Sequence, residues 1–251
     1  MLILLPPSEG KAAARRGKPL DLSTLDFSDL TAPREQVLHA LLELCDGDPD
    51  VAAKTLGIGT TQLDLVELNR GLRSNPTARA DQVYTGVVYD ALDFATLSTG
   101  AKRRANTRVA VTSSLFGLVR PADRIPSYRL SGDTTLPGLG PVAGVWREHL
   151  GPVVTEAVGG GLLVDLRSGT YVNFWRPTDV KVATVRVLHE HNGQRKVVSH
   201  FNKATKGRIV RALLESGADP RTPAKLAAAL RDLGWTVEED GSQFDVVVSE
   251  L

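Results

Sequence analysis

Chemically capable side chains gather at two polar turns of this chain. The first turn follows the apolar run Leu2–Leu5 and the pair Pro6-Pro7, and it offers a hydroxyl, a carboxylate and an amine within four residues. The second turn lies within residues 109–130, between an apolar run and a tyrosine-arginine pair. Loops held by a rigid scaffold are where proteins usually display such groups. The candidate catalytic residues of the two turns are Ser8, Glu9, Lys11, Ser113, Asp123, Tyr128 and Arg129.

These residue types suit acid–base chemistry on an anionic molecule. Glu9 or Asp123 could act as a general base, and Ser113 could act as a nucleophile or a hydroxyl donor. Lys11 or Arg129 could clamp an oxyanion or a phosphate. A nucleotide-like or other anionic small molecule would fit this set as a substrate. Residues 8–11 are not a Walker phosphate loop, because the GxxxxGK[ST] spacing is missing.

The second turn also has a purely structural interpretation. Asp123 could cap a turn and pair with a nearby arginine. The arginines within reach along the chain are Arg120, Arg124 and Arg129. We expect this stretch to open with a buried strand over 109–112, where β-branched residues form a short apolar run. A second strand is expected over 127–130.

The charge of the chain is balanced overall but unevenly placed. The 251 residues carry a formal net charge of +1, so no global field recruits a polyanion. Residues 94–122 and 191–214 contain bases but no acid. These stretches form a positive groove if they share a face, and separate solvated faces otherwise. The second stretch includes a helix expected over 203–216 and capped by Asn202. Its exposed cations are Lys203, Lys206, Arg208 and Arg211.

Residues 51–72 predict two short helices, over 51–56 and 61–72, around the turn Leu56-Gly57-Ile58-Gly59. In a helix-hairpin-helix, such glycines let backbone N–H groups approach a nucleic-acid phosphate at the start of the second helix. A simple corner between two helices uses the same glycines. Both interpretations stay open at this point.

The remaining pattern is that of a mixed α+β protein. Helices are expected over 33–44, 91–104, 142–150 and 222–233, and strands over 2–5, 162–166, 181–189, 196–201, 235–238 and 244–249. A short strand or bend is expected at 84–89, and a Pro/Gly loop at 134–141. The strands lack a regular βαβ rhythm, so we expect a mixed sheet surrounded by helices, in a single domain over 1–251.

Several classes of protein find no support in the chain. No run approaches the roughly 18 apolar residues of a membrane span, so we expect a cytoplasmic protein without membrane contact. The single Cys45 excludes an internal disulfide and a CxxC pair, and we expect a buried, inert thiol. His189, His191 and His200 could bind a metal, but exposed hairpin histidines are commoner. We therefore predict neither a metal nor a cofactor.

Five separated stretches resemble the YaaA family of peroxide-stress proteins. They read LLPPSEGK at residues 4–11, YTGVVYDAL at 84–92, SSLFGLVRPADRIPSYRL at 113–130, LLVDLRSGTY at 162–171 and KATKGRIVRALL at 203–214, in the family's order. The resemblance spans nearly the whole chain, and the long third motif is the specific one. The chain departs from the family pattern at Pro6, Asp165, Thr170 and Lys206.

The resemblance implies both a fold and a function. It implies a cytoplasmic α+β protein with a positively charged cleft and a helix-hairpin-helix element, which maps onto residues 51–72 within an insert over 50–73. It also implies DNA binding and protection against hydrogen peroxide, linked to limiting free intracellular iron. The matches onto the cleft are Ser8, Glu9, Lys11, Tyr84, Tyr89, Ser113, Arg120, Asp123, Tyr128, Arg129, Ser168, Tyr171, Lys203 and Arg208.

Two functions of different class follow. A DNA-binding protein without sequence preference would hold phosphates with cations and stack bases on aromatic rings. Its cations would be Lys11, Arg120, Arg129, Lys203, Lys206 and Arg208, its stacking rings Tyr84, Tyr89 and Tyr128, with Ser168 and Tyr171 completing the anion-binding set. An enzyme would take a small anionic molecule in the same cleft. A closed, ligand-sized cavity favours the enzyme, and an open groove favours DNA.

Overall fold

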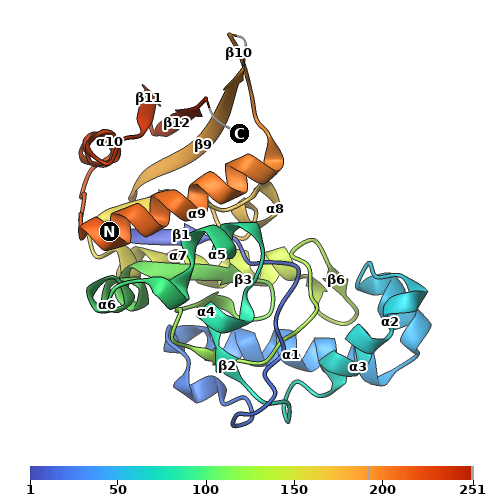
Figure 1. Ribbon diagram of the computed structural model, residues 1–251. Helices are drawn as coiled ribbons and strands as arrows, with labels where there is room; N and C mark the ends of the chain where they lie inside the picture. Colours follow the sequence, from blue (N-terminus) through green and yellow to red (C-terminus); the bar gives the residue numbers. More distant parts are fainter. Residues whose placement is uncertain (192, 250–251) are drawn as a thin grey trace.

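An eight-stranded mixed sheet forms the centre of the protein (Figure 1). The computed structural model describes residues 1–191 and 193–249. Within them the strand order is β11-β12-β9-β8-β1-β3-β4, with β10 paired to β9. The strands are β1 (Leu2–Leu5), β3 (Val109–Ser113), β4 (Gly117–Val119), β8 (Leu162–Asp165), β9 (Lys181–His191), β10 (Gln194–Lys196), β11 (Thr236–Asp240) and β12 (Gln243–Val248). The predicted α+β class with a mixed sheet is confirmed.

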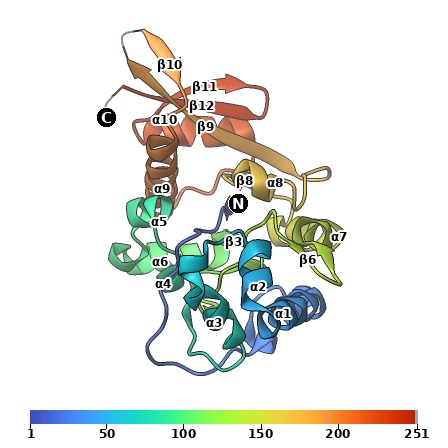
Figure 2. The ribbon, with the colours of Figure 1, turned by 90° about the vertical axis from the view of Figure 1, so that its right-hand side faces the viewer.

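The strands at the centre of this sheet are parallel and covered on both faces. β3, β1, β8, β9 and β12 pair in parallel, whereas β4, β10 and β11 join antiparallel. β1, β3 and β8 are buried along their whole length. Their continuous apolar runs are typical of strands covered by helices on both sides. Figure 2 shows α5 (Val87–Leu92), α6 (Thr99–Arg108) and α9 (Ser199–Ser216) on one side and α7 (Val142–Val158) on the other.

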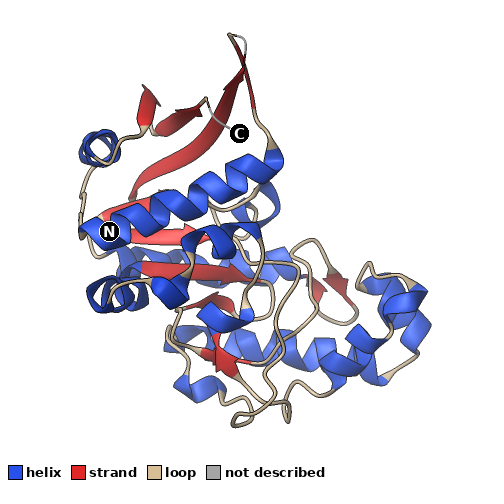
Figure 3. Ribbon diagram, in the orientation of Figure 1, coloured by secondary structure: helices blue, strands red, loops and turns tan. Residues whose placement is uncertain are grey.

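The lower part of the molecule in Figure 3 is mostly helical. It contains α1 (Thr31–Asp46), α2 (Pro49–Thr55), α3 (Asp64–Arg70) and α4 (Ala80–Val83), with the short 3-10 turns η1 (Leu22–Thr24), η2 (Ser28–Leu30) and η3 (Thr60–Gln62). A two-stranded ladder pairs β2 (Ala78–Arg79) with β5 (Arg124–Ile125). The helices predicted over 33–44 and 51–56 are confirmed. The second helix of the predicted hairpin is shorter than 61–72 and begins after η3.

The C-terminal elements agree with their sequence signals. α10 (Pro223–Asp232) is capped by Thr222, whose Oγ1 accepts a hydrogen bond from the Lys225 N–H at 3.3 Å. β11 and β12 form the predicted terminal hairpin. α7 extends well beyond the predicted 142–150 and contains Pro152. No helix of the described residues is both long enough and apolar enough to cross a membrane.

The prediction of a strand over 127–130 is wrong. These residues have no regular secondary structure. Their backbone groups are paired by side chains: Ser114 Oγ donates to the Leu130 carbonyl at 2.5 Å, and the Asn69 amide bonds both the N–H and the C=O of Arg129. A segment whose polar backbone is satisfied in this way needs no ladder partner.

The expected boundaries of several other elements are also wrong. Tyr84 makes an isolated bridge with Lys11, and α5 follows where a strand or bend was expected at 84–89. The helix over 91–104 is interrupted at Asp93, whose left-handed φ of 48° separates α5 from η4 (Phe94–Thr96) and α6. The loop at 134–141 contains a small ladder of β6 (Thr135–Leu136) and β7 (Gly140–Pro141).

The hairpin predicted over 181–201 is confirmed only in its first part. β9 and β10 pair, and the turn position Asn192 lies outside the described residues. β10 ends at Lys196 and α9 begins at Ser199, so Asn202 lies inside the helix and does not cap it. The Phe201 ring packs on His189 of β9 at a centroid distance of 5.8 Å, which anchors the first turn of α9 on the sheet.

Arg34 of α1 is a fully buried cation that holds the β3–β4 connection. Its Nε donates to the Phe116 carbonyl at 3.0 Å. Its Nη2 donates to the carbonyls of Leu118 and Asp26, both at 2.7 Å. Three carbonyls, of which those of Phe116 and Leu118 are buried, therefore depend on one guanidinium.

We expect Arg34→Met to lower the free energy of unfolding by about 3 kcal/mol, because Met fills the volume but leaves buried carbonyls unpaired. Chemical denaturation measures the change. The matched control is Arg73→Met, which removes an exposed ion pair with Glu35 and should cost at most about 1 kcal/mol. Equal losses in the two variants would contradict the structural role of Arg34.

Candidate functional site

The carboxyl ends of three parallel strands meet at one edge of the sheet. β1 ends at Leu5, β3 at Ser113 and β8 at Asp165. β1 pairs in parallel with both of the others, so the loops that follow these ends lie close together. Ligands in open sheets of parallel strands usually bind at such ends. The topology thus joins residues 6–11, Ser113 and residues 166–171 from distant parts of the chain.

A cavity of about 350 Å³ opens between these loops. Residues 6–10, residues 85–89, Ser168, Tyr171 and Lys203 line it. We call it the Glu9 pocket, because the Glu9 carboxylate joins the surrounding segments. Arg129 Nη1 donates to Glu9 Oε2 at 2.7 Å, and Tyr171 Oη donates to Glu9 Oε1 at 3.4 Å. Six of the residues predicted for the site line this cavity, namely Ser8, Glu9, Tyr89, Ser168, Tyr171 and Lys203, and Arg129 contacts it through Glu9.

Ser8 shapes the turn at the rim of this pocket. Its Oγ donates to the Gly10 carbonyl at 2.6 Å and accepts from the Thr85 N–H at 3.0 Å. Thr85 Oγ1 donates to the same Gly10 carbonyl at 3.1 Å. The turn is therefore fastened to the segment that precedes α5. Thr85 was not singled out from the sequence, where a lone threonine carries no signal.

Lys11 lies against an aromatic wall. Its Nζ donates to the Ser8 carbonyl at 2.7 Å and lies 4.2 Å from the centroid of the Tyr128 ring. Burial lowers the pKa of Lys11 to about 8, although the nearby Glu9 carboxylate opposes this shift. A group with a strongly shifted pKa beside a pocket is a common mark of a functional site.

A chain of buried hydroxyls connects β3 to the pocket wall. Tyr128 Oη lies 2.8 Å from Ser113 Oγ and 3.0 Å from Tyr84 Oη. The Tyr84 and Tyr89 rings stack at a centroid distance of 5.5 Å, and Tyr89 Oη donates to the Pro6 carbonyl at 2.7 Å. Burial raises the pKa of Tyr128 to about 12. These hydroxyls stay protonated at neutral pH.

The expectation that bases stack on Tyr84, Tyr89 and Tyr128 does not agree with this packing. All three rings are buried. Tyr84 and Tyr89 cover each other, and the edge of Phe116 meets Tyr128 at a centroid distance of 5.6 Å. Base stacking needs an accessible ring face. The rings instead build the wall behind the Glu9 pocket.

Asp123 and Arg120 lie at the opposite end of β3. The Asp123 carboxylate accepts from the Arg120 N–H at 2.7 Å and from the Asp26 N–H at 3.0 Å. Burial raises the pKa of Asp123, although both bonds oppose the shift. Arg120 Nη1 donates to the carbonyl of Val109, the first residue of β3. These contacts support the interpretation of Asp123 as a turn cap and place neither residue at the Glu9 pocket.

The cations of α9 face different surroundings. Lys203 is exposed and lines the Glu9 pocket. Lys206 Nζ donates to the Leu166 carbonyl at 3.3 Å and lines a separate cavity beside Asp165. Burial lowers the pKa of Lys206. Arg208 is exposed and lines a third cavity, so Lys203 is the member of this set that the structure places with Glu9.

Other cations of the two acid-free stretches bind backbone carbonyls. Arg104 Nε donates to the Leu214 carbonyl at 2.6 Å, and Arg211 Nη1 donates to the Leu92 carbonyl at 2.9 Å. These bonds join α6 and α5 to α9, which also pack together. The two stretches thus meet in space, but these side chains fix helices to one another. The positively charged cleft stays a prediction.

The glycine hairpin has the expected connection but an acidic neighbourhood. Gly57 adopts a left-handed φ of +62°, and the Ile58 N–H donates to the Ala53 carbonyl at 3.0 Å. Asp64 and Glu67 lie in the first turn of α3. Arg70 pairs with Glu67 and also binds the carbonyl of Cys45.

Cys45 is buried and its thiol pKa is raised by burial, as expected of an inert thiol.

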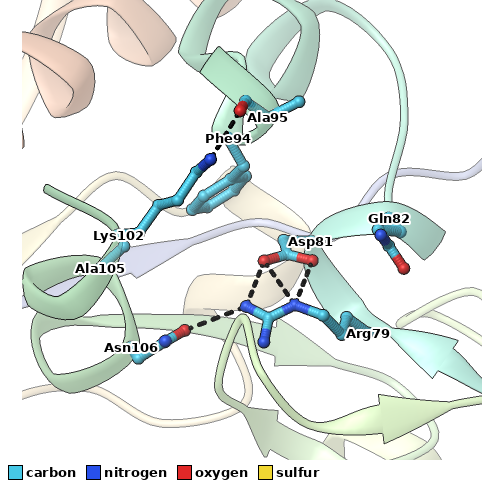
Figure 4. Close-up of a pocket in the computed structure, with 8 residues that line it drawn as sticks. All are labelled: Arg79, Asp81, Gln82, Phe94, Ala95, Lys102, Ala105 and Asn106. Carbon is cyan, nitrogen blue, oxygen red and sulfur yellow. Dashed lines mark hydrogen bonds and ion pairs between the residues drawn. The ribbon is translucent and has the colours of Figure 1, made fainter. Parts of the chain in front are cut away.

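A second cavity, of about 330 Å³, holds polar groups that bind one another (Figure 4). Arg79 Nη2 donates to Asp81 Oδ2 at 2.6 Å, and Lys102 Nζ donates to the Ala95 carbonyl at 2.7 Å. In Figure 4 the Gln82 side chain points away from the others. The residues predicted for the functional site do not line this cavity.

Metal ligands are not gathered in the described part of the chain. No group of three His, Cys, Asp or Glu side chains there could hold a metal ion. The ring of Phe201 packs on His189 and also meets the His200 ring at a centroid distance of 5.7 Å. His191 is exposed at the end of β9.

Stability should depend on pH through Lys11. Between about pH 8 and its ordinary value of 10.5, Lys11 is neutral when folded and protonated when unfolded. Unfolding then takes up a proton, so stability rises with pH in this window, and the contribution of Lys11 to stability does not change with pH below it. We expect wild type to gain on the order of 2 kcal/mol relative to Lys11→Gln from pH 7 to pH 10, measured by chemical denaturation. A constant difference between them would contradict the shifted pKa.

This chain is similar to known proteins over most or all of its length. A sequence profile for the family described as "Peroxide stress protein YaaA" matches residues 1–241. A UPF0246 protein of Streptomyces coelicolor is 50% identical over 100% of both chains. A UPF0246 protein of Corynebacterium efficiens is 44% identical over 95% of each, and an uncharacterized protein of Campylobacter jejuni is 28% identical over 82% of each. The chain therefore belongs to the YaaA family of peroxide stress proteins.

Proposed function

We propose that this protein takes part in the peroxide stress response by binding, and acting on, a small anionic molecule in the Glu9 pocket. The family description supports the role in peroxide stress. The observation that carries the ligand class is the position of the exposed cation Lys203 on a cavity that Glu9 also lines, with Arg129 bound to the Glu9 carboxylate at 2.7 Å. A cavity of about 350 Å³ falls within the range of small-molecule sites.

The residues of the pocket divide into ligand holders and reactive groups in this proposal. Lys203 and Arg129 supply charge-assisted hydrogen bonds to a phosphate or carboxylate. Ser168 also lines the cavity and offers a hydroxyl. Glu9 is the carboxylate that lines the cavity, so it is the general base of this proposal. A double helix is far too wide for such a cavity, which favours a nucleotide-sized molecule over duplex DNA at this place.

We expect Lys203→Ala to weaken the binding of adenosine 5′-monophosphate or inorganic phosphate at least tenfold, because a charged contact is lost from the pocket. Isothermal titration calorimetry measures the affinity. Arg208→Ala is the matched control, since Arg208 is an exposed cation of the same helix at another cavity. Equal effects of the two substitutions would indicate nonspecific attraction by α9 and would remove the proposal.

The same pair of variants connects the pocket to the cellular role. In a strain that lacks this protein, the proposal requires that Arg208→Ala restore survival in hydrogen peroxide and that Lys203→Ala fail to do so. The family resemblance also implies a link to free iron. Electron paramagnetic resonance of chelated iron measures the free iron in the same cells. Full rescue by Lys203→Ala would separate peroxide protection from the pocket.

DNA binding at the glycine hairpin is the second candidate function. The specific observation in its favour is the α2–η3–α3 arrangement around left-handed Gly57, with Lys54 exposed on α2. The acids Asp64 and Glu67 at the start of α3 oppose a phosphate there. This contact would therefore be weak and strongly dependent on salt.

If the hairpin binds DNA, Lys54→Ala should reduce the slope of log affinity against log salt by about one unit, because one phosphate contact is lost. Fluorescence anisotropy with a labelled duplex over a salt series gives the slope. Lys225→Ala, an exposed lysine of α10, should leave the slope unchanged. Absence of binding at low salt would identify the hairpin as a simple corner between helices.

A further inference from the structure

Arg129 reaches the Glu9 carboxylate, which lines the Glu9 pocket, from a segment without regular secondary structure. Residues 126–130 lack regular secondary structure, although Tyr128 and Leu130 are buried. Both backbone groups of Arg129 are nevertheless paired with one side chain. Asn69 Oδ1 accepts from the Arg129 N–H at 2.9 Å, and Asn69 Nδ2 donates to the Arg129 carbonyl at 2.8 Å.

The position of Asn69 is itself fixed by the helix on which it lies and by its burial. It lies on α3, next to the residue that binds the α1 carbonyl at Cys45, and its side chain is completely buried. A primary amide offers a donor and an acceptor side by side, which matches the N–H and C=O of one extended residue. An apolar residue here would leave two partly buried backbone groups without this partner, and each such loss costs stability.

Because Asn69 fixes the backbone of Arg129, the Arg129 side chain starts from a fixed position. Its Nη1 meets Glu9 at 2.7 Å, and its Nε is buried without a hydrogen-bond partner among the described residues. The side chain is 21% exposed, whereas that of Glu9 is 54% exposed. The guanidinium is thus placed by the protein interior, and the carboxylate reaches it from the more exposed loop.

We propose that Asn69 is the positioning residue of the Glu9 pocket, and that it ties the glycine hairpin to the pocket by fixing the backbone of Arg129. This inference rests on the proposed binding of an anion at Arg129. A shift of α3 moves Asn69, and Arg129 moves with it. Ligand binding at the pocket and the order of α3 are therefore linked, and such linkage acts equally in both directions.

The experiment is a double-mutant cycle on the full chain, with inorganic phosphate and adenosine 5′-monophosphate as the probes. Calorimetry gives the affinities of wild type, Arg129→Ala, Asn69→Ala and the double variant. We expect each single variant to weaken binding about tenfold or more. The double variant should be no weaker than Arg129→Ala alone, because Asn69 acts through Arg129.

Asn75→Ala is the matched control. Asn75 Nδ2 donates to the Leu68 carbonyl at 3.0 Å, so this variant also removes an amide that supports α3, but one without a bond to Arg129. It should leave the affinity unchanged. If Asn69→Ala does not fold, Asn69→Asp takes its place in the cycle, since it keeps the acceptor for the Arg129 N–H and loses the donor.

Hydrogen exchange supplies a readout that needs no ligand. Amides of residues 6–10 should exchange faster in the Asn69 variant and at the wild-type rate in Asn75→Ala, because a displaced Arg129 no longer holds Glu9. If wild type binds neither probe, the proposed function fails. The hydrogen-exchange rates alone then decide whether Asn69 is a positioning residue. If Arg129→Ala weakens binding while the Asn69 variant binds like wild type, the positioning role is overturned.

Discussion

Buried backbone without regular secondary structure needs partners for its N–H and C=O groups, and side chains supply many of them in the irregular parts of residues 113–130, around β4 and β5. Arg34 donates to one carbonyl of the β3–β4 turn and to one of β4, and Trp146 Nε1 donates to the Ser114 carbonyl at 2.7 Å. Asp123 pairs with the Arg120 N–H, and Asn69 of α3 pairs with both backbone groups of Arg129. Four side chains thereby fix the path of this segment. That path places Tyr128 against Lys11 and Arg129 against Glu9, so the site depends on how buried polar groups are paired.

The parallel strands supply the other half of the arrangement. β1, β3 and β8 are neighbours in the sheet but lie about 50 to 160 residues apart in the chain. Their carboxyl ends bring Glu9, Ser113 and Tyr171 to one edge, and α9 adds Lys203 from outside the sheet. Because every wall of the pocket comes from a different element, its geometry depends on the packing of the whole sheet rather than on any local turn.

The predictable part of this structure is the part governed by local pattern. Apolar runs identified β1, β3 and β8, and the residue types in the two turns identified Glu9 and Arg129 as chemically capable. The prediction of a strand over 127–130 failed because tertiary hydrogen bonds pair the backbone groups there. Such bonds leave no periodic pattern in the sequence. Asn69 had no signal for the same reason: a lone asparagine on a helix is unremarkable until its partner, 60 residues away, is known. The early start of α9 was missed because Phe201 was assigned to a strand, and its packing on His189 decides otherwise.

The different uses of the cations explain how a chain with a net charge of +1 can still present an anion site. Arg104 and Arg211 donate to carbonyls and fasten helices, so their charges are committed within the fold. Lys206 binds a carbonyl at 3.3 Å, while Lys203, less than one turn earlier on α9, faces the pocket. The charge pattern of the sequence does not distinguish these cations. Their surroundings in the structure decide which of them can contact a ligand. A few cations at a partly enclosed cavity attract a small anion at short range, where low-dielectric walls strengthen the field. A polyanion would require an extended row of free charges, and the bonds to carbonyls withdraw Arg104 and Arg211 from any such row.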